Sequence, residues 1–197
     1  ASGLNNKYLG DNRYPGSKPD DENTMSALDV AIIADHLIKD YPQVLDITKQ
    51  GEVDFEGDNK LTTHNYMLEG QDNYREGVDG LKTGTTELAG ASFVAHSNEN
   101  GMSLITVVMN ADNGGEDEAA RFTATNDLLD YVVQHWKINK LNTKGQIVKK
   151  NDIKVADGVS KTVSAKLESD LTVVQKINSQ NDTVNIKAKT VTAPIKK

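Results

Sequence analysis

Residues 77–90 of this 197-residue chain read GVDGLKTGTTELAG. We interpret the first part of this stretch, residues 77–84, as a β-strand. Two β-rich runs follow at residues 92–97 and 103–109, and an Asn100-Gly101 pair lies between them. Asn-Gly is a strong hairpin signal, because both residues readily adopt the positive φ that a tight turn requires. The sequence therefore predicts three neighbouring strands that belong to one sheet.

Two helices are expected to accompany this sheet. The first covers about residues 25–40, since Ser26 and Asp29 form a capping-box pattern and apolar residues then follow at helical spacing. The second covers about Glu116 to Trp136, with acidic residues at its start that suit the helix dipole. The apolar face of the second helix has to be buried, and the sheet is the candidate surface.

The composition of the chain changes near position 137. All six Tyr, all three Phe, the single Trp, all four Met and all four His lie at or before that position. Residues 1–137 carry 10 basic and 24 acidic side chains, a net charge of −14, whereas residues 138–197 carry 12 lysines and 5 acids, a net charge of +7. This change predicts two domains, residues 1–137 and residues 138–197.

The second segment shows the alternation of half-buried strands. Polar and apolar residues alternate at about 163–167, 171–177 and 184–188, and turn-rich stretches separate these runs. We expect a small, antiparallel, all-β domain with a thin core, because it has no aromatic residues, so that it leans on the first domain or on a partner. Its lysines are interpreted as solvated strand faces, with binding of a wall polymer or of lipid headgroups as the alternative.

The overall composition excludes several classes of protein. The net charge of −7 argues against a nucleic-acid partner for the chain as a whole. The absence of cysteine excludes disulfides, thiolate zinc sites and a cysteine nucleophile. There is no signal peptide and no apolar run of about 18 residues, so an exported protein would need a leader outside this sequence. The histidines lack metal-ligand spacing, and we predict no metal and no cofactor.

Lys82-Thr83-Gly84 is the motif with chemical content. A phosphate loop would need Lys directly after Gly and a helix directly after the motif, and neither condition is met. The other interpretation is the edge strand of a serine acyl-transferase that acts on peptides or β-lactams, in which Lys and Thr hold the substrate carboxylate and Gly allows close approach. Lys-Thr-Gly is a known signature of penicillin-recognising enzymes, together with S-x-x-K and S-D-N.

The longer sequence context resembles one family. The run of residues 77–90, followed by Leu104-Ile105-Thr106-Val107-Val108-Met109, is similar to the D-alanyl-D-alanine carboxypeptidases, the low-molecular-mass penicillin-binding proteins. The SGL at residues 2–4 and the segments around residues 25–29 and 120–131 are also similar to that family. The resemblance implies an α+β fold, part of a penicillin-binding-protein/β-lactamase-like antiparallel sheet packed by helices, followed by a small all-β domain.

The resemblance also implies site residues and a missing part. Catalytic roles would belong to Lys82, Thr83, Gly84 and Thr85: Lys82 and Thr83 position the substrate carboxylate, Gly84 lets the strand approach, and the Thr85 N–H is one oxyanion donor. The nucleophilic serine of S-x-x-K is absent, and the one S-x-N match, at residues 179–181, is out of family order. We therefore expect a C-terminal portion of a longer protein that is inactive by itself.

Two further residues remain open at this point. Arg121 is a candidate for binding the substrate carboxylate, and the alternative, which we favour, is a solvated ion pair with Asp117 or Glu118 one turn back. His64 precedes the active strand; one interpretation is a place at the strand edge or against a residue that contacts substrate, and the one that we favour is a structural histidine.

The expected function of the intact protein follows from the resemblance. It would be a penicillin-sensitive, serine-type D-Ala-D-Ala carboxypeptidase, a hydrolase that trims peptidoglycan stem peptides through an acyl-enzyme. Its partners would be stem peptides, β-lactams and the missing N-terminal part. It would be exported to the extracellular face of the bacterial cytoplasmic membrane, held there by a C-terminal anchor absent from this sequence. The alternatives are a non-catalytic wall-binding or scaffolding protein, and a β-lactamase.

Overall fold

The computed structural model describes residues 5–111, 117–147, 152–179 and 191–192. The chain separates into two compact units, Ala1–Val133 and Gln134–Lys197. The division lies a few residues before position 137, where the composition changes. We describe each unit by itself.

The first unit is built on a three-stranded antiparallel sheet. Its strands β3 (Val78–Thr86), β4 (Gly90–Glu99) and β5 (Met102–Val108) follow one another in space as they do in sequence. The hairpin between β4 and β5 turns at Asn100 and Gly101, which have φ values of 50° and 80°. The predicted strands and the predicted Asn-Gly turn are therefore confirmed, and β3 is an edge strand among the described residues.

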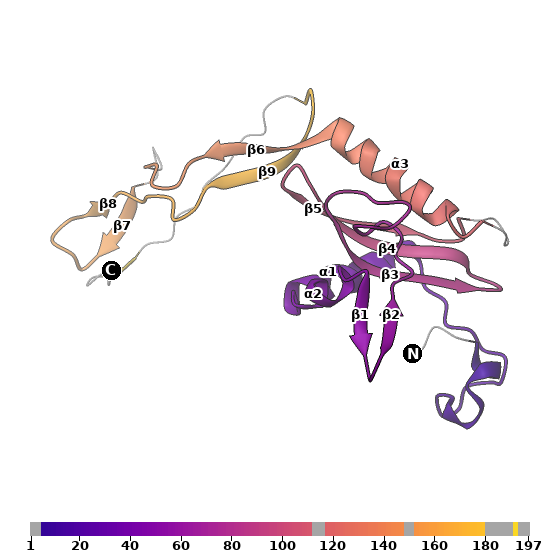
Figure 1. The fold of residues 1–197 in the computed structure, drawn as a ribbon. Helices are drawn as coiled ribbons and strands as arrows, with labels where there is room; N and C mark the ends of the chain where they lie inside the picture. Colours follow the sequence, from indigo (N-terminus) through magenta and orange to yellow (C-terminus); the bar gives the residue numbers. More distant parts are fainter. Residues whose placement is uncertain (1–4, 112–116, 148–151, 180–190, 193–197) are drawn as a thin grey trace. The chain divides into compact units, whose positions relative to one another are not determined.

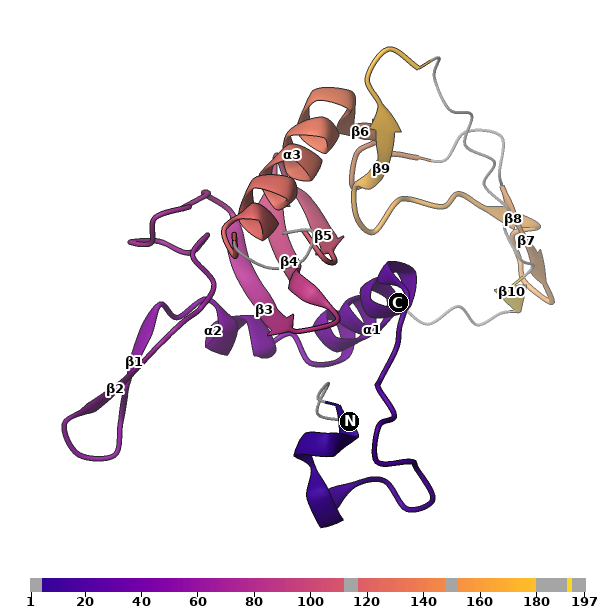
Figure 2. The same cartoon turned by 90° about the vertical axis from the view of Figure 1, so that its right-hand side faces the viewer.

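Helices lie on both faces of this sheet. Figures 1 and 2 show α3 (Ala120–His135) against one face, with α1 (Ala27–Asp40) and the short α2 (Val44–Thr48) on the other. The core under α3 is formed by one cluster of buried apolar residues, namely Met67, Leu68, Val78, Phe93, Ala95, Phe122 and Leu129. Phe93 and Phe122 meet edge to face with ring centroids 5.5 Å apart, an arrangement that aromatic pairs favour.

The start of α1 matches its sequence signal. The Ser26 side chain accepts a hydrogen bond from the Asp29 backbone N–H, and the Asp29 carboxylate accepts one from the Ser26 backbone N–H. This reciprocal pairing satisfies two donors that would otherwise be free at a helix N-terminus. The predicted capping box is confirmed.

The second predicted helix differs from α3 at both ends. It begins at Ala120, so the acids Asp117 and Glu118 precede it, and the Asp117 side chain accepts a hydrogen bond from the Ala119 N–H in the turn before it. Trp136 does not end the helix but begins strand β6. Acidic residues are favourable both at the N-cap of a helix and in its first turn, so they do not fix the first helical residue. This explains why α3 begins later than the sequence predicted.

A β-bulge interrupts the pairing of β3 with β4. Val78 pairs with Ser97 and Gly80 pairs with His96, so β3 has one more residue than β4 over this step, between the two pairs. Gly77 comes just before it, with φ +92°, and a Cβ there would lie 2.4 Å from the Asn98 carbonyl oxygen. This position therefore accepts only glycine.

Polar side chains also bind the strands and helices of this unit together. The buried His96 of β4 lies 2.5 Å from Asp79 of β3 and 2.8 Å from Ser103 of β5. Arg75 donates to Glu99 of β4 and to Asp130 of α3, and these carboxylates, Glu99 first, raise the pKa of the Arg75 guanidinium. These contacts connect residues far apart in sequence.

A separate hairpin precedes β3. Its strands β1 (Glu52–Phe55) and β2 (Asn59–Thr62) pair antiparallel and are exposed throughout. Neither this hairpin nor α2 was expected from the sequence, because the hairpin residues are mostly polar and α2 is a single short helix.

The second unit consists of short strands. β6 (Trp136–Asn142) pairs antiparallel with β9 (Leu171–Lys176), and β7 (Ile153–Ala156) pairs antiparallel with β8 (Thr162–Val163) and parallel with β10 (Val191–Thr192). The alternation predicted at 171–177 is visible in β9. The module is not wholly antiparallel, however, because β10 pairs parallel with β7, and this pairing was not expected. The predicted run at 184–188 lies outside the described residues.

The α+β fold class predicted from the sequence is confirmed, with an antiparallel sheet packed by helices and a small β module after it. Among the described residues, none of the helices has the length and apolar character that a membrane span requires.

Candidate functional site

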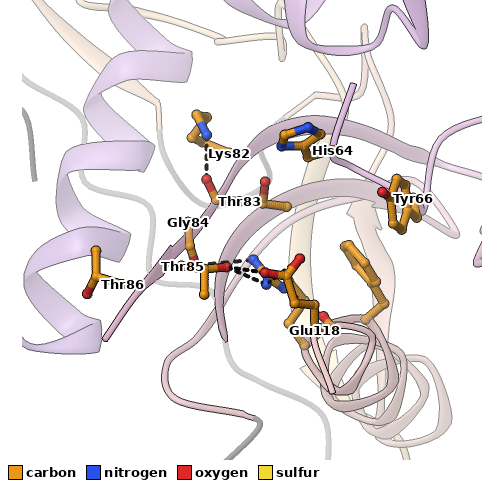
Figure 3. A pocket seen from close by; sticks show the side chains of 10 residues that line it. His64, Tyr66, Lys82, Thr83, Gly84, Thr85, Thr86 and Glu118 are labelled. Atoms are coloured by element: carbon orange, nitrogen blue, oxygen red, sulfur yellow. Dashed lines mark hydrogen bonds and ion pairs between the residues drawn. The ribbon is translucent and has the colours of Figure 1, made fainter. Parts of the chain in front are cut away.

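A cavity of about 560 Å³ lies beside the second half of β3 (Figure 3). Its lining comes from three places: residues 82–86 of β3, His64 and Tyr66 from the segment after β2, and Glu118, Arg121 and Phe122 at the start of α3. The fold therefore brings together all of the site residues proposed from the sequence. Side-chain alternation along an extended strand explains why neighbours of the motif differ in exposure.

Lys82 is exposed at this cavity, and its ammonium donates to the Thr83 backbone carbonyl. Lys82 forms no ion pair within the described part of the chain, where all the ion pairs involve other cations. An ammonium group without a carboxylate partner is suited to bind an anionic group of a ligand.

Thr83, Gly84 and Thr85 continue the wall of the cavity. Thr83 is buried, whereas Gly84 and Thr85 are exposed. They pair with β4 on one side only, because β3 is the edge of the described sheet. The other side of this backbone is therefore free to pair with an extended peptide.

Arg121 is buried and fully engaged within the protein. Its Nε donates to the Glu118 carbonyl at 2.7 Å, its Nη1 donates to the carbonyls of Gly84 and Ser92 at 3.1 and 3.2 Å, and its Nη2 donates to the Thr85 hydroxyl at 2.7 Å. The ion pair with Glu118 exists at 3.5 Å, but Arg121 is only 3% exposed. The favoured ion pair with Glu118 is therefore present, but its arginine is buried and only its glutamate, which is 68% exposed, is solvated.

The hydrogen bonds of Arg121 change how its role is understood. Each guanidinium nitrogen already has a protein acceptor, and these acceptors belong to β3, β4 and the turn before α3. Direct binding of a substrate carboxylate would require the exchange of at least one of these bonds. The geometry favours a positioning role, in which Arg121 fixes the strand that carries the motif.

Glu118 adds a carboxylate to the cavity. It is largely exposed, and it accepts a hydrogen bond from the Thr85 hydroxyl at 3.1 Å. With Lys82 and Arg121 it leaves the described lining with a formal charge of +1, which suits an anionic group of a ligand.

His64 and Tyr66 were not assigned to the site from the sequence. His64 is exposed on the cavity wall and makes no hydrogen bond or ion pair with other described residues, so it is not the structural histidine that we expected. Tyr66 packs against Phe122 with centroids 5.6 Å apart. They come from the segment between β2 and β3, and no sequence signal fixes the path of such a segment.

The other histidines stay away from the cavity. His96 lies within the network with Asp79 and Ser103, and His36 lies 3.9 Å from Asp40 on α1. Within the described ranges, no group of three or more His, Cys, Asp or Glu residues is arranged to hold a metal ion.

Comparison with known proteins gives a consistent family. The family of D-alanyl-D-alanine carboxypeptidases matches residues 2–113. D-alanyl-D-alanine carboxypeptidase DacA of Escherichia coli K12 is 36% identical over 106 residues, which are 54% of this chain and 24% of that protein.

Solved structures agree over nearly the whole chain. A peptidoglycan synthesis regulatory factor (PBP3) from Streptococcus pneumoniae has 46% identity and a TM-score of 0.90, and the match covers 99% of this chain and 53% of that one. Penicillin binding protein 5 from Haemophilus influenzae has 27% identity and a TM-score of 0.63, covering 98% and 56%. This chain thus spans about a quarter of the E. coli protein and about half of the two solved chains.

Proposed function

Because this chain belongs to the D-alanyl-D-alanine carboxypeptidase family, we propose that the cavity beside β3 binds the C-terminal carboxylate of a peptide that ends in D-alanyl-D-alanine. The intact protein would then remove the terminal D-alanine from peptidoglycan stem peptides. The observation that supports this most directly is the exposed Lys82, which has no carboxylate partner among the described residues and lies on an edge strand that lines the cavity.

The reaction needs a serine that these 197 residues do not provide as S-x-x-K. In the proposed sequence, the serine oxygen attacks the carbonyl carbon of the bond between the two D-alanines and passes its proton to the lysine of that motif. The D-alanine amine leaves with a proton, and an ester to the serine remains. Water then hydrolyses the ester, which returns the serine and releases the shortened peptide.

This chain would contribute binding and charge stabilisation to those steps. Lys82 and Thr83 would hold the terminal carboxylate, the free edge of β3 would pair with the peptide backbone, and the Thr85 N–H would donate to the oxyanion. A second oxyanion donor would come from the serine backbone. A β-lactam would occupy the same place and acylate the same serine.

A comparison of free acid and amide tests the carboxylate site. We expect a peptide that ends in D-Ala-D-Ala to perturb the NMR amide signals of residues 82–86, and the same peptide with a C-terminal amide to bind at least about ten-fold more weakly. Lys82→Met should remove this difference, whereas Lys39→Met on α1, an exposed lysine on another element, should keep it. Equal binding of acid and amide would refute the proposal.

A second test concerns the nucleophile. The chain by itself should form no acyl-enzyme, so incubation with a fluorescent penicillin should leave no labelled band at about 21.5 kDa on a denaturing gel. A longer product of the same gene that contains S-x-x-K should be labelled. Labelling of the chain itself would show that another group in these residues is acylated.

A non-catalytic role in wall binding or scaffolding is the second candidate. A parent gene without S-x-x-K would decide for it. Rapid turnover of penicillin by the intact protein would instead indicate a β-lactamase.

The partner and location of the intact protein are further parts of the proposal. Leu28, Ile32 and Ile33 of α1 are 68%, 49% and 56% exposed, and apolar side chains grouped on a helix are normally covered. We infer that an N-terminal part of the same protein covers them. A place at the extracellular face of the cytoplasmic membrane would fit the peptidoglycan substrate, and fractionation of cells would test it.

A further inference from the structure

A serine, a histidine and an aspartate meet on the sheet away from the cavity at Lys82. His96 of β4 lies 2.5 Å from a carboxylate oxygen of Asp79 through Nδ1, and 2.8 Å from the Ser103 hydroxyl through Nε2. None of the three residues lines that cavity, and the proposed function gives none of them a role. A nucleophile within hydrogen-bond reach of a base, with the base oriented by a third group, is the arrangement of an activated serine.

The β-bulge of β3 brings Asp79 into this arrangement. Gly80 is the pairing partner of His96, and side chains alternate along a regular strand, so the residue before Gly80 would normally face the other side of the sheet. Asp79 is the extra residue of the bulge, and a bulge redirects a side chain. Its carboxylate therefore reaches the imidazole of the neighbouring strand. Its backbone carbonyl accepts a hydrogen bond from the Thr48 hydroxyl of α2 at 2.8 Å.

The carboxylate fixes which ring nitrogen of His96 carries the proton. An ionised carboxylate can only accept hydrogen bonds, so Nδ1 is the protonated nitrogen of the neutral ring and Nε2 is the acceptor. The Ser103 hydroxyl then donates to Nε2, which is the direction that proton transfer from the serine requires. The opposite tautomer would donate to the hydroxyl oxygen and leave it unactivated.

The exposure of the three side chains suits these roles. His96 is 2% exposed, so solvent does not compete for its ring nitrogens. The Asp79 side chain is 24% exposed, and Ser103 is an exposed residue of β5. A reagent can therefore reach the hydroxyl without displacing the base.

The backbone of Ser103 supplies a donor for the negative charge that develops in an acyl transfer. The turn between β4 and β5 has two residues, so the closing pair of Glu99 and Met102 is hydrogen-bonded. Such pairs alternate with pairs that are not hydrogen-bonded, and the next pair is Asn98 with Ser103. The Ser103 N–H thus points away from β4, and β5 is at the edge of the described sheet. In serine proteases of the chymotrypsin type, the N–H of the nucleophilic serine is one of the two oxyanion donors.

We propose that Ser103 is a nucleophile, with His96 as its base and Asp79 as the residue that positions the base, and that it takes the acyl group of an activated ester. The serine oxygen attacks the ester carbonyl carbon, and the serine proton passes to His96 Nε2. The bond from that carbon to the alcohol oxygen breaks, the alcohol leaves with the proton, and an ester to Ser103 remains. Water hydrolyses this ester by the same route. The inference goes beyond the proposed function and does not depend on it.

A fluorophosphonate with a fluorescent tag tests the nucleophile. The Ser103 oxygen would bond to phosphorus, the phosphorus–fluorine bond would break, and fluoride and the serine proton would pass to solvent. We expect Ser103 to be labelled at least about 100-fold faster than Ser160, an exposed serine of the second unit, because general-base catalysis contributes about 10²–10⁴-fold. Digestion and mass spectrometry assign the labelled residue.

Hydrolysis of p-nitrophenyl acetate tests turnover of an activated ester. The parent chain should release p-nitrophenolate at least about ten-fold faster than Ser103→Ala, since the general base acts on both acylation and hydrolysis. Equal release by the two proteins would show that Ser103 does not take the acyl group, and would overturn the ester part of the proposal.

Variants assign the roles of the three residues. Ser103→Ala should lose the label, and His96→Gln should lower the labelling rate to that of Ser160. Asp79→Asn should lower the rate at least about ten-fold, because an amide can donate to Nδ1 and reverse the tautomer. Asp54→Asn on the exposed strand β1 is the matched control and should leave the rate unchanged.

Nitrogen NMR of the His96 ring separates a positioning role of Asp79 from a merely structural one. In the parent chain the neutral ring should carry its proton on Nδ1, and in Asp79→Asn on Nε2. If Asp79→Asn keeps the parent tautomer, or is labelled as fast as the parent, Asp79 does not position the base and that assignment is wrong.

The remaining outcomes decide for or against the nucleophile itself. Labelling of Ser103 no faster than Ser160 would overturn the inference, as would a label that Ser103→Ala keeps. This comparison is made in the unaltered chain, so it decides the question even if His96→Gln does not fold. Ser103→Ala should still bind a D-Ala-D-Ala peptide like the parent, which keeps the proposed function separate. Penicillin is a weaker electrophile than a fluorophosphonate, so we still expect no penicillin-labelled band.

Discussion

Arg121 connects three elements through one side chain. The side chain is 3% exposed and therefore shielded from solvent, and its hydrogen bonds reach β3, β4 and the turn before α3. Its loss would leave the carbonyl groups of Gly84, Ser92 and Glu118 without this donor, and a hydrogen bond to a charged group contributes about 1.5–3 kcal/mol.

Truncation of this side chain should therefore destabilise the first unit. We expect Arg121→Ala to lower the free energy of unfolding by about 2–5 kcal/mol, measured by urea denaturation followed by far-UV circular dichroism. Arg13→Ala is the control, since Arg13 lies in the N-terminal segment outside the cavity, and it should change little. If Arg121→Ala is as stable as the parent but loses peptide binding, Arg121 binds the substrate directly.

At the scale of single residues, the motif and its neighbours could be predicted from the sequence, but the contacts that each residue makes could not. Lys82, Thr83, Gly84 and Thr85 are contiguous, and one strand brings them together. The exposure of His64 and the burial of Arg121 depend on how loops and helix ends pack, and local patterns contain no information on such long-range contacts.

The helix α3 is the element that closes the site from one side. Its start supplies Arg121 and Phe122, and Phe122 is 2% exposed between Phe93 and Tyr66. The helix was predictable from its apolar spacing, whereas its first residue depends on the turn at Asp117.

The packing of α3 can be tested with two substitutions on the same helix. Phe122→Ala should cost about 3–5 kcal/mol of unfolding free energy, because it removes a fully buried ring from the core. Leu128→Ala should cost far less, since Leu128 is 43% exposed. Urea denaturation of both variants measures the difference, and similar losses would mean that α3 does not pack as described.

The capping box of α1 predicts that the stability of the protein depends on pH. Hydrogen bonds from the Ser26 side chain, and then from its backbone N–H, lower the pKa of Asp29 below its ordinary 3.8. A carboxyl group with a lowered folded-state pKa stabilises the protein fully above its unfolded-state pKa, and this contribution is lost as pH falls through the folded-state value. The relevant window therefore lies at and below about pH 4.

We expect Asp29→Ala to lower the melting temperature at pH 7 and to lower it much less near pH 2. In a Ser26→Ala background the same substitution should show a weaker dependence on pH, because the largest cause of the shift is gone. Thermal melts at several pH values of the parent chain, the two single variants and the double variant measure this dependence. A deficit that is the same at every pH would contradict the lowered pKa.

On the scale of the whole molecule, the two units differ in how much they bury. The first contains the apolar cluster under α3. In the second, Gln175 is the single buried side chain among the described residues, and Val174 and Ile138 are 57% and 37% exposed. The thin core expected from the missing aromatics agrees with this, since burial of apolar area is the main favourable term in folding.

The second unit should therefore unfold first. Trp136 begins β6 and is the single tryptophan of the chain, so its fluorescence reports on that unit, whereas helical circular dichroism reports on α1 and α3. We expect the fluorescence midpoint in urea to lie below the circular dichroism midpoint. Coincident midpoints would show that the chain unfolds as one cooperative unit.

The bulge between Val78 and Gly80 has a consequence for any change of length in this strand. Neighbouring residues of a strand face opposite ways, so an insertion or deletion that shifts the pairing of β3 by one residue would exchange its two faces. The ammonium of Lys82 would then turn inward and the hydroxyl of Thr83 outward. Single-residue insertions and deletions here should thus be far more damaging than substitutions. Natural variants should therefore keep the number of residues in this stretch constant.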